Sequence, residues 1–518
     1  MRNGRTGTWL LVVVMLLSIV ATACKSGDGG SAGTGGETEP NVAENTESPG
    51  SEGETGTEPE GEQPADDGAP PVQDLGGYTF VVADNNPNRW FPEEGSSDLA
   101  NAIIDRVKWV EETYNVRIEV RKHSEDELSA AVLAGDKYAD VIVTPTWELG
   151  RHINGKRLVD LNTIPNLDMS KDYWKEYNTS NLLTYDNRTY GAAAPFANQN
   201  DEVWVIVFNK RILNELGLEN PYELVKNKQW TFEKMLEMEK AAKRDLNGDG
   251  VMDSNDRYGL ATGHDWDIAV ALYLASGNKI IDIAPDGKMT YAVNTPKAYE
   301  TLDTIKQMTK RGDTFFPKND GEDMDAYVKA FVEGKALFLA YSRGRGVIDP
   351  IYQMEDDFGF VPLPMGNNTD DYLSWVSHDA PSIAVPVTNK ELDKTGLILE
   401  ALAWKAKDEE KIRLDEIAFT QLRDDESLEI LQQLKNYGVS DMAFIGQQMQ
   451  GNVHSGLALI PSVGFYEQDL EPASKVAEIE EAVNIGLEEL ALRLKGEYVE
   501  PEKPAEEGKE EEKAEKAE

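Results

Sequence analysis

The order of apolar and polar residues in the first half of the chain predicts alternating strands and helices. Three short apolar runs are typical of buried strands, at residues 78–83, 116–121 and 139–144. Residues 97–113 have helical spacing between the first two runs, and Ser124 with Glu127 forms a capping box that opens a second helix. This order predicts a parallel, doubly wound sheet with ligand-binding loops beyond the carboxyl ends of its strands.

A second set of elements follows the first. Residues 202–208 are apolar on both faces, as a buried strand should be, and residues 231–244 have helical spacing. Thr295 and Pro296 supply an N-cap and a first turn, and a late apolar stripe from Val476 is closed by Gly496. We expect this stripe to pack in the core. The folded part is too long for a single core, which indicates two lobes.

The N-terminus has the pattern of an export signal. Arg2 and Arg5 precede an apolar stretch at residues 9–20, which is too short to span a bilayer as a helix. Small residues then lead into Cys24, which resembles a bacterial lipobox and predicts lipidation after cleavage of residues 1–23. The alternative is ordinary secretory cleavage with an unmodified cysteine. Cys24 is the only cysteine, so no internal disulfide can form.

Acidic residues dominate the charge, which is −43 for the whole chain. This excludes a general nucleic-acid binder, because such a protein needs a basic face. Residues 25–74 hold thirteen acidic residues against one lysine, and residues 497–518 hold ten against four. Both segments have few apolar residues, so we expect residues 24–74 to be a disordered linker and residues 497–518 a disordered tail.

One acidic segment has the spacing of a calcium-binding loop. Residues 245–256 follow the twelve-residue EF-hand pattern, with Asp in place of Glu at the last position. The candidate ligands are Asp245, Asn247, Asp249, the main-chain carbonyl of Val251, Asp253 and Asp256. Asp253 and Asp256 compete for the last ligand position. The loop occurs once and a strand-like segment follows it, so we expect one structural Ca²⁺ and no sensor; the alternative is an acidic turn without metal.

Four tryptophans stand in polar segments, at positions 90, 147, 266 and 375. An indole in a polar loop can cover the apolar face of a sugar ring while neighbouring polar groups meet its hydroxyls. For each of them the alternative is a loop anchor packed on the core. The five histidines show no metal-ligand spacing, and His-Glu-x-x-His, Gly-x-Ser-x-Gly and Walker A motifs are absent from the sequence. We therefore expect each histidine to be a surface or loop residue.

Several segments, taken in order, resemble the extracellular solute-binding proteins of sugar-importing ABC transporters, the group that includes maltose-binding protein. They are Leu158-Val-Asp160-Leu161, Tyr190-Gly191 to Pro195, Phe208-Asn209-Lys210, Trp230-Thr231-Phe232, Ala275-Ser276-Gly277, Phe331 to Ala336, Phe358 to Pro364 and Ser382 to Pro386. The resemblance covers residues 75–496. It implies an α/β, two-lobed periplasmic-binding-protein-like fold with a hinge and a cleft between the lobes.

The resemblance also implies a division of the chain and a set of ligand contacts. The expected parts are a first lobe at 75–194, a second lobe at 195–361, a return to the first lobe at 362–386 and C-terminal helices, mainly of the second lobe, at 387–496. The contacts that the resemblance implies are Asp84, Asn85, Trp147, Glu148, Asn198, Gln199, Trp266, Arg343, Phe465 and Tyr466. The polar-segment tryptophans Trp90 and Trp375 complete the expected set. Arg343 stands where the family often has an aromatic residue, a departure that favours an anionic ligand.

The function that the resemblance implies is capture of a carbohydrate, most simply an oligosaccharide, and its delivery to ABC permease subunits. The protein would be a monomer held by lipid at the outer face of the cytoplasmic membrane, and it would not be an enzyme. Two alternatives remain at this point. One is a surface carbohydrate-active enzyme, and the other is a receptor that feeds a sensor protein.

Overall fold

The computed structural model describes residues 68–175, 183–197, 199–262, 265–316, 325–342, 349–449, 451–467 and 469–499. The predicted signal segment, Cys24 and nearly all of both acidic tails lie outside these residues. Among the described helices, none is both long and apolar enough to cross a lipid bilayer.

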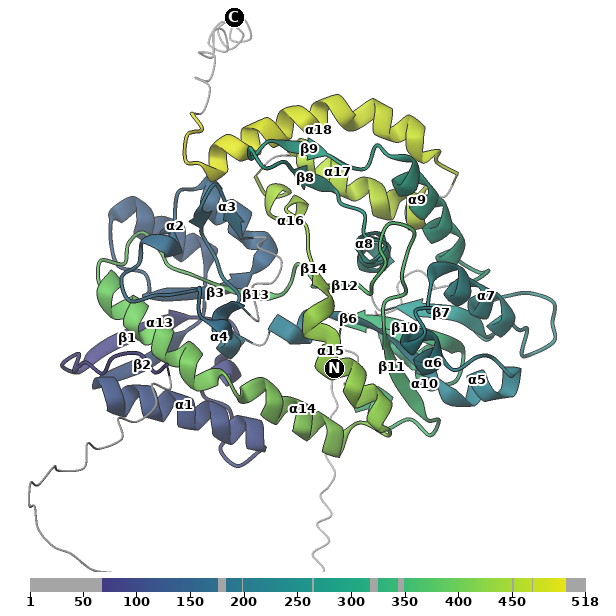
Figure 1. Ribbon diagram of the computed structural model, residues 1–518, viewed down its shortest axis with the longest axis horizontal. Helices are drawn as coiled ribbons and strands as arrows, with labels where there is room; N and C mark the ends of the chain where they lie inside the picture. Colours follow the sequence, from purple (N-terminus) through teal and green to yellow (C-terminus); the bar gives the residue numbers. More distant parts are fainter. Residues whose placement is uncertain are drawn as a thin grey trace, which may run out of the picture. The chain divides into compact units, whose positions relative to one another are not determined.

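One sheet gathers strands from two distant parts of the sequence, in the order β13-β3-β1-β2 (Figure 1). Its strands are β1 (Tyr78–Ala83), β2 (Val116–Arg121), β3 (Val141–Pro145) and β13 (Pro381–Ala384). β1 pairs in parallel with β2 and β3, as the sequence predicts, whereas β13 joins β3 in the antiparallel direction. We call this sheet and the elements packed on it the first lobe.

The helices of the first lobe begin where local capping predicts. Its helices are α1 (Asp98–Tyr114), α2 (Glu125–Ala134), α3 (Leu149–Asn154), α4 (Asp172–Lys175) and α13 (Leu392–Ala406). Ser97 and Ser124 cap α1 and α2 by accepting backbone N–H groups, which satisfies donors that a helix start leaves unpaired. α13 packs on α1, so this part of the 387–496 segment belongs to the first lobe.

The second sheet has the order β11-β6-β10-β7 and defines the second lobe. Its strands are β6 (Trp204–Asn209), β7 (Tyr258–Thr262), β10 (Ala336–Ser342) and β11 (Phe358–Pro362). β6 is buried along its whole length and runs antiparallel to both β10 and β11, while β10 and β7 are parallel. The chain enters β6 directly from the first lobe and not through a crossover helix, which allows β6 to run antiparallel to its neighbours.

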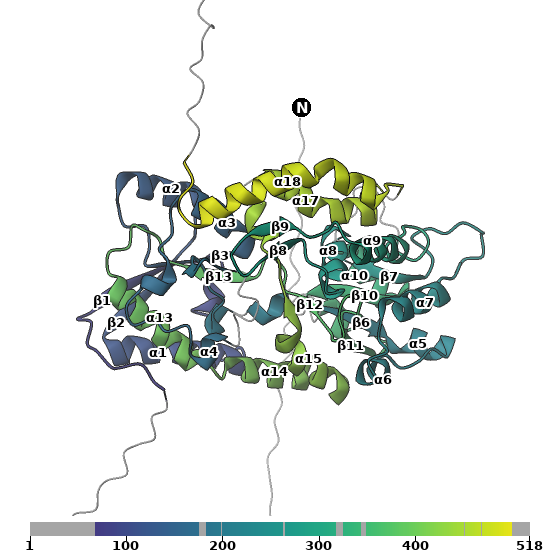
Figure 2. The ribbon, with the colours of Figure 1, turned by 45° about the horizontal axis from the view of Figure 1, so that its top comes forward.

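Helices surround the second sheet and continue into the C-terminal part. They are α5 (Lys210–Leu216), α6 (Pro221–Lys226), α7 (Phe232–Ala242), α8 (Asp265–Ala275), α9 (Pro296–Met308), α10 (Asp325–Val332), α12 (Asp349–Tyr352), α14 (Glu409–Thr420), α15 (Asp425–Tyr437), α16 (Ala443–Gly446), α17 (Gly451–Pro461) and α18 (Pro472–Leu494). α18 lies along α17 (Figure 2). Its predicted apolar stripe faces the core through buried residues that include Val483 and Leu490.

The chain passes between the two sheets three times. The first passage reaches β6, the second leaves β11 for β13, and the third runs through α14, which packs on α1 before α15 packs on β11. The first two passages lie side by side, because Val203 and Val376 form an antiparallel bridge and Ser377 donates its backbone N–H to the Glu202 carbonyl at 2.8 Å. Short strands β12 (Ser374–Trp375) and β14 (Gly438–Val439) pair beside them.

Candidate functional site

Trp147 lies immediately beyond the carboxyl end of β3, in the 3-10 turn η2 (Thr146–Glu148). Its backbone N–H donates to the His378 carbonyl at 3.2 Å, and its indole Nε1 donates to Asp379 Oδ1 at 3.1 Å. The indole is half-buried. It is therefore held by the segment that precedes β13, although more than two hundred residues separate the two in sequence.

Trp266 approaches the same segment from the first turn of α8. Its ring centroid lies 5.7 Å from that of His378, in an edge-on arrangement, and 6.4 Å from that of Phe444 in α16. Its side chain is also half-buried. The structure thus brings Trp147 and Trp266, from different lobes, to one two-residue turn. Trp147 donates a hydrogen bond to Asp379, and Trp266 packs against His378.

A layer of buried aromatic rings supports this turn. The His378 ring stacks on Trp375 with centroids 5.5 Å apart and on Phe444 with centroids 5.3 Å apart. Trp375 is fully buried and also packs on Trp204. The expectation that Trp375 contacts ligand is therefore wrong for this structure, since its ring faces are covered by protein.

Asp84 and Trp90 form a second internal pair. Trp90 Nε1 donates to Asp84 Oδ2 at 2.9 Å, and the Trp90 ring packs on Phe196 with centroids 5.6 Å apart. Both residues are buried, and Asp84 also accepts the backbone N–H of Asn86 at 2.8 Å. The expected ligand contacts at Asp84 and Trp90 are corrected accordingly, because each satisfies the other inside the first lobe. Asn85, between them in sequence, is exposed.

The remaining expected contacts divide between core and surface. Phe465 is buried against Phe315, with ring centroids 5.0 Å apart, so its expected ligand contact is also corrected. Its neighbour Tyr466 is 56% exposed at the end of η6 (Ser462–Tyr466). Asn198 and Arg343 lie outside the described residues, as does the side chain of Gln199.

Although Glu148 follows Trp147 directly in sequence, its side chain lies in a different group of residues. Its carboxylate accepts the Thr144 hydroxyl at 2.8 Å and lies near His123, Glu125 and His152. Burial raises the pKa of Glu125, but the two neighbouring imidazoles lower it by more, and the net shift is downward. His152 is a buried helix residue, contrary to the expectation of a surface or loop position, whereas His123 is buried but lies in a loop. The four-residue spacing of Glu148 and His152 on a helix was the one sequence signal for this group.

The acidic loop predicted to bind calcium connects α7 to β7. Gly248 and Gly250 adopt positive φ angles of 74° and 81°, which fold the loop tightly. The two Asp245 carboxylate oxygens accept the backbone N–H groups of Gly248 at 2.6 Å and Gly250 at 2.8 Å. Asn247 donates its side-chain amide to Asp249 Oδ2 at 2.8 Å. The loop thus curls around its own side-chain oxygens.

Asp256 fastens the two ends of this loop. It is fully buried, and its two oxygens accept the backbone N–H groups of Leu246 at 2.8 Å and Asp253 at 2.9 Å. These N–H donors hold the pKa of Asp256 below its ordinary value. In the described part of the chain, no lysine or arginine forms an ion pair with Asp245, Asp249 or Asp253. Carboxylates crowded on one turn without a cationic side chain suit a hard divalent cation.

The sequence model of a family described as bacterial extracellular solute-binding protein matches residues 92–411. A search of curated protein sequences gives no match.

Solved structures with the same fold have low sequence identity to this chain. The GacH receptor of Streptomyces glaucescens, determined unliganded and with acarbose, has a TM-score of 0.52 at 14% identity, covering 80% of this chain and 99% of its own. An ABC substrate-binding protein from Listeria monocytogenes in complex with cycloalternan has a TM-score of 0.51 at 15% identity, with coverage of 80% and 99%. A maltose-binding protein from the same species, in complex with maltose, has a TM-score of 0.51 at 14% identity, with coverage of 82% and 99%. These likenesses show the two-lobed fold.

Proposed function

Because this chain belongs to the bacterial extracellular solute-binding proteins, we propose that it captures a carbohydrate between its two lobes and delivers it to an ABC permease. The observation that carries the proposal is the meeting of Trp147 and Trp266 at the His378–Asp379 turn. The structurally similar receptors described with acarbose, cycloalternan and maltose support the choice of a sugar as ligand.

The chemistry of this turn suits a sugar. The half-buried indoles of Trp147 and Trp266 can cover the apolar faces of pyranose rings, and the Asp379 carboxylate and His378 imidazole can meet hydroxyl groups. The hydrogen bond from Trp147 Nε1 to Asp379 fixes the orientation of the indole before any ligand arrives. Less conformational freedom is then lost on binding, which favours affinity.

We propose further ligand contacts on exposed segments and on segments near the passages between the lobes. Asn85 and Tyr466 are exposed and remain in the proposed site. Asn198, Gln199 and Arg343 are proposed from the family resemblance, and Arg343 favours a ligand that carries negative charge. The buried residues Asp84, Trp90, Trp375 and Phe465 are proposed to shape the lobes without touching ligand.

We also propose that residues 245–256 bind one structural Ca²⁺. Asp245, Asn247, Asp249, the Val251 carbonyl and Asp253 would supply its oxygen ligands. The buried Asp256 would act as the brace of the loop, since it is enclosed by protein and joins the backbone N–H groups of Leu246 and Asp253. The ion would offset the repulsion among the carboxylates and so stabilise the connection from α7 to β7.

Finally, we propose that Cys24 carries the lipid anchor. It follows an apolar stretch and small residues that suit cleavage just before it. Several acyl chains on this residue would hold the protein firmly at the membrane, whereas a single chain would hold it only marginally. The acidic stretch after Cys24 would then separate the folded lobes from the membrane surface.

The sugar site predicts that tryptophan substitutions weaken binding without unfolding the protein. A melting-temperature panel with di- to hexasaccharides identifies the ligand, because ligand at a hundredfold over its Kd adds about 2.7 kcal/mol of stability. Trp147→Ala and Trp266→Ala should each weaken calorimetric binding about tenfold or more, since a lost stacking contact costs on the order of 1–2 kcal/mol.

Trp109→Ala is the matched control for these variants. Trp109 is also half-buried, but it packs on Trp404 in the first lobe, away from the His378–Asp379 turn. We expect this variant to bind the identified sugar normally. Normal binding by both site variants, or a loss of binding explained by unfolding in both, would remove Trp147 and Trp266 from the site.

The calcium proposal predicts that substitutions of Asp249 and Asp256 have different effects. Asp249→Asn should weaken Ca²⁺ binding and reduce the loss of melting temperature that a chelator causes in the wild type. Asp256→Asn should lower the melting temperature with chelator present as well, because it removes a brace made of hydrogen bonds. Calorimetric titration of stripped protein is the direct measurement, and no Ca²⁺ uptake up to millimolar concentration would refute the site.

The lipid proposal predicts that Cys24→Ala releases the protein from the membrane fraction or leaves it unprocessed. Cell fractionation followed by mass spectrometry of the N-terminal peptide distinguishes these outcomes. A Cys24→Ala protein that stays bound as firmly as the wild type would show that some other segment provides the anchor.

A further inference from the structure

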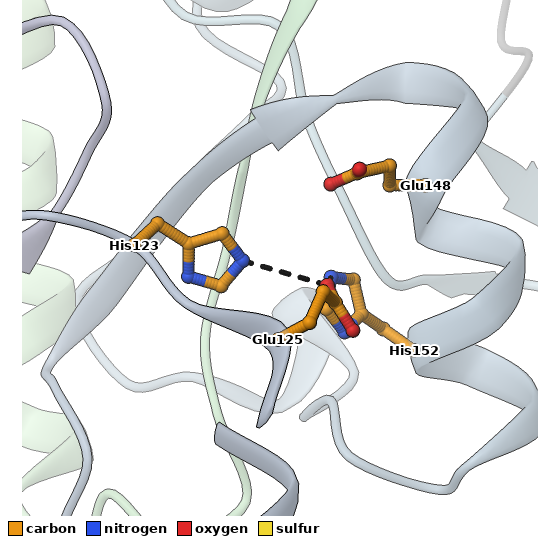
Figure 3. A group of neighbouring side chains, drawn as sticks. All are labelled: His123, Glu125, Glu148 and His152. Carbon is orange, nitrogen blue, oxygen red and sulfur yellow. Dashed lines mark ion pairs between the residues drawn. The ribbon is translucent and has the colours of Figure 1, made fainter. Parts of the chain in front are cut away.

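Four side chains of the first lobe converge from two separate segments (Figure 3). His123 and Glu125 flank Ser124, the N-cap of α2, while Glu148 ends η2 and His152 lies in α3. Each contributes one imidazole nitrogen or carboxylate oxygen, and these atoms all lie within 4.8 Å of one another. No part of the proposed sugar or calcium sites accounts for this group.

The atoms that face the centre of the group are buried and lie close together without forming well-aligned hydrogen bonds. His152 Nε2 lies 2.8 Å from Glu125 Oε1, and His123 Nε2 lies 3.5 Å from the same oxygen. Despite this proximity, none of the three atoms forms a hydrogen bond of good geometry with any described residue, and His152 Nδ1 also has no hydrogen-bond partner among those residues. A buried polar atom left unpaired destabilises the folded state, so native proteins rarely keep several of them together.

The outer atoms of the same residues are held by a second ring of contacts. His123 Nδ1 lies 3.1 Å from the Tyr138 hydroxyl, which also accepts the backbone N–H of Ser124 at 2.8 Å. Arg157 donates to Glu125 Oε2 at 3.0 Å. With the Thr144 hydroxyl on Glu148, these contacts orient three of the four side chains and leave their remaining donor atoms directed inward. Metal-binding histidines and carboxylates are held by partners of this kind.

The charges also suit a cation. Glu125 and Glu148 carry two negative charges, and the Arg157 guanidinium offsets one of them. An imidazole that binds a metal ion does so in its neutral form, so it adds a nitrogen ligand without adding charge. A divalent ion would therefore enter a group whose net charge is negative.

We propose that His123, Glu125 and His152, with Glu148 as the fourth ligand, form a structural Zn²⁺ site. Two imidazole nitrogens with carboxylate oxygens suit Zn²⁺, whereas Ca²⁺ and Mg²⁺ prefer oxygen ligands throughout. Ligand atoms bound to Zn²⁺ at about 2.0–2.2 Å lie roughly 3–4 Å apart, so the four side chains close by about 1 Å on binding. The burial of both imidazoles favours a closed, structural site over one with an open position for water.

The site has a consequence for the neighbouring turn. Glu148 follows Trp147 directly in η2, and α3, which carries His152, packs against α16 and α18. Bound Zn²⁺ would fix η2 and α3 to the start of α2. The existence of the metal site does not depend on the identity of the ligand at Trp147.

Calorimetric titration of Zn²⁺ into the full chain tests this proposal, using protein purified through a histidine-free tag and stripped with EDTA. We expect one Zn²⁺ per chain with a Kd of about 1 μM or tighter. His123→Gln and His152→Gln should each weaken binding more than about 100-fold, because loss of a ligand exceeds the 10–100-fold cost of losing an outer partner. His454→Gln, at an exposed histidine in α17, is the matched control and should bind as the wild type does.

Two further measurements distinguish the zinc site from misfolding of the histidine variants and from Zn²⁺ binding at the calcium loop. Co²⁺ added to stripped wild-type protein should give the intense visible bands of a four-coordinate site, and Zn²⁺ should abolish them. Asp249→Asn should retain full Zn²⁺ binding. No Zn²⁺ uptake below millimolar concentration, or equal uptake by the His123→Gln/His152→Gln double variant, would overturn the proposal.

Discussion

The antiparallel pairing of β13 with β3 is the constraint from which the rest of this structure follows. β13, the last strand of the first sheet, follows all four strands of the second sheet in sequence, so the chain must pass back between the lobes. Thr146 strengthens this junction, because its hydroxyl contacts both the Ala380 carbonyl at 2.9 Å and the Ser382 hydroxyl at 2.8 Å. Neither lobe can be cut from the sequence as a continuous piece.

The same constraint creates the candidate site. The residues just before β13 must lie beside the loop that follows β3, which places His378 and Asp379 against Trp147. The second lobe contributes Trp266, whose ring lies against that of His378, and the buried rings of Trp375 and Phe444 stack on His378. A ligand held by both indoles would therefore contact the segment that joins the lobes. Movement of that segment is what hinge closure around a ligand requires.

Local sequence rules predicted the elements well and the site only in part. β1 and β2 begin and end at the expected residues, because apolar patterning and the caps Ser97 and Ser124 are encoded locally. A polar neighbourhood, however, does not report whether a tryptophan is exposed. Trp90 stands among polar residues because Asp84 is the internal partner of its indole N–H, and no local pattern distinguishes that role from sugar binding.

The histidine group shows a related limit. His123 and His152 come from separate segments that the fold of the first lobe brings together, so no spacing in the sequence links them. The acidic loop is the opposite case, since all its candidate ligands lie within twelve residues and its glycines adopt the positive φ angles that such a loop needs. Sequence reasoning is strong where chemistry is local and weak where the topology assembles it.

Hydrogen–deuterium exchange of the protein with and without its identified sugar tests the central claim most directly, because it reports which segments one ligand protects. A sugar held between the lobes should slow exchange together in the peptides that contain Trp147, Trp266 and the His378–Asp379 turn. Slowed exchange confined to the peptides of a single lobe, under conditions that saturate binding, would contradict the account.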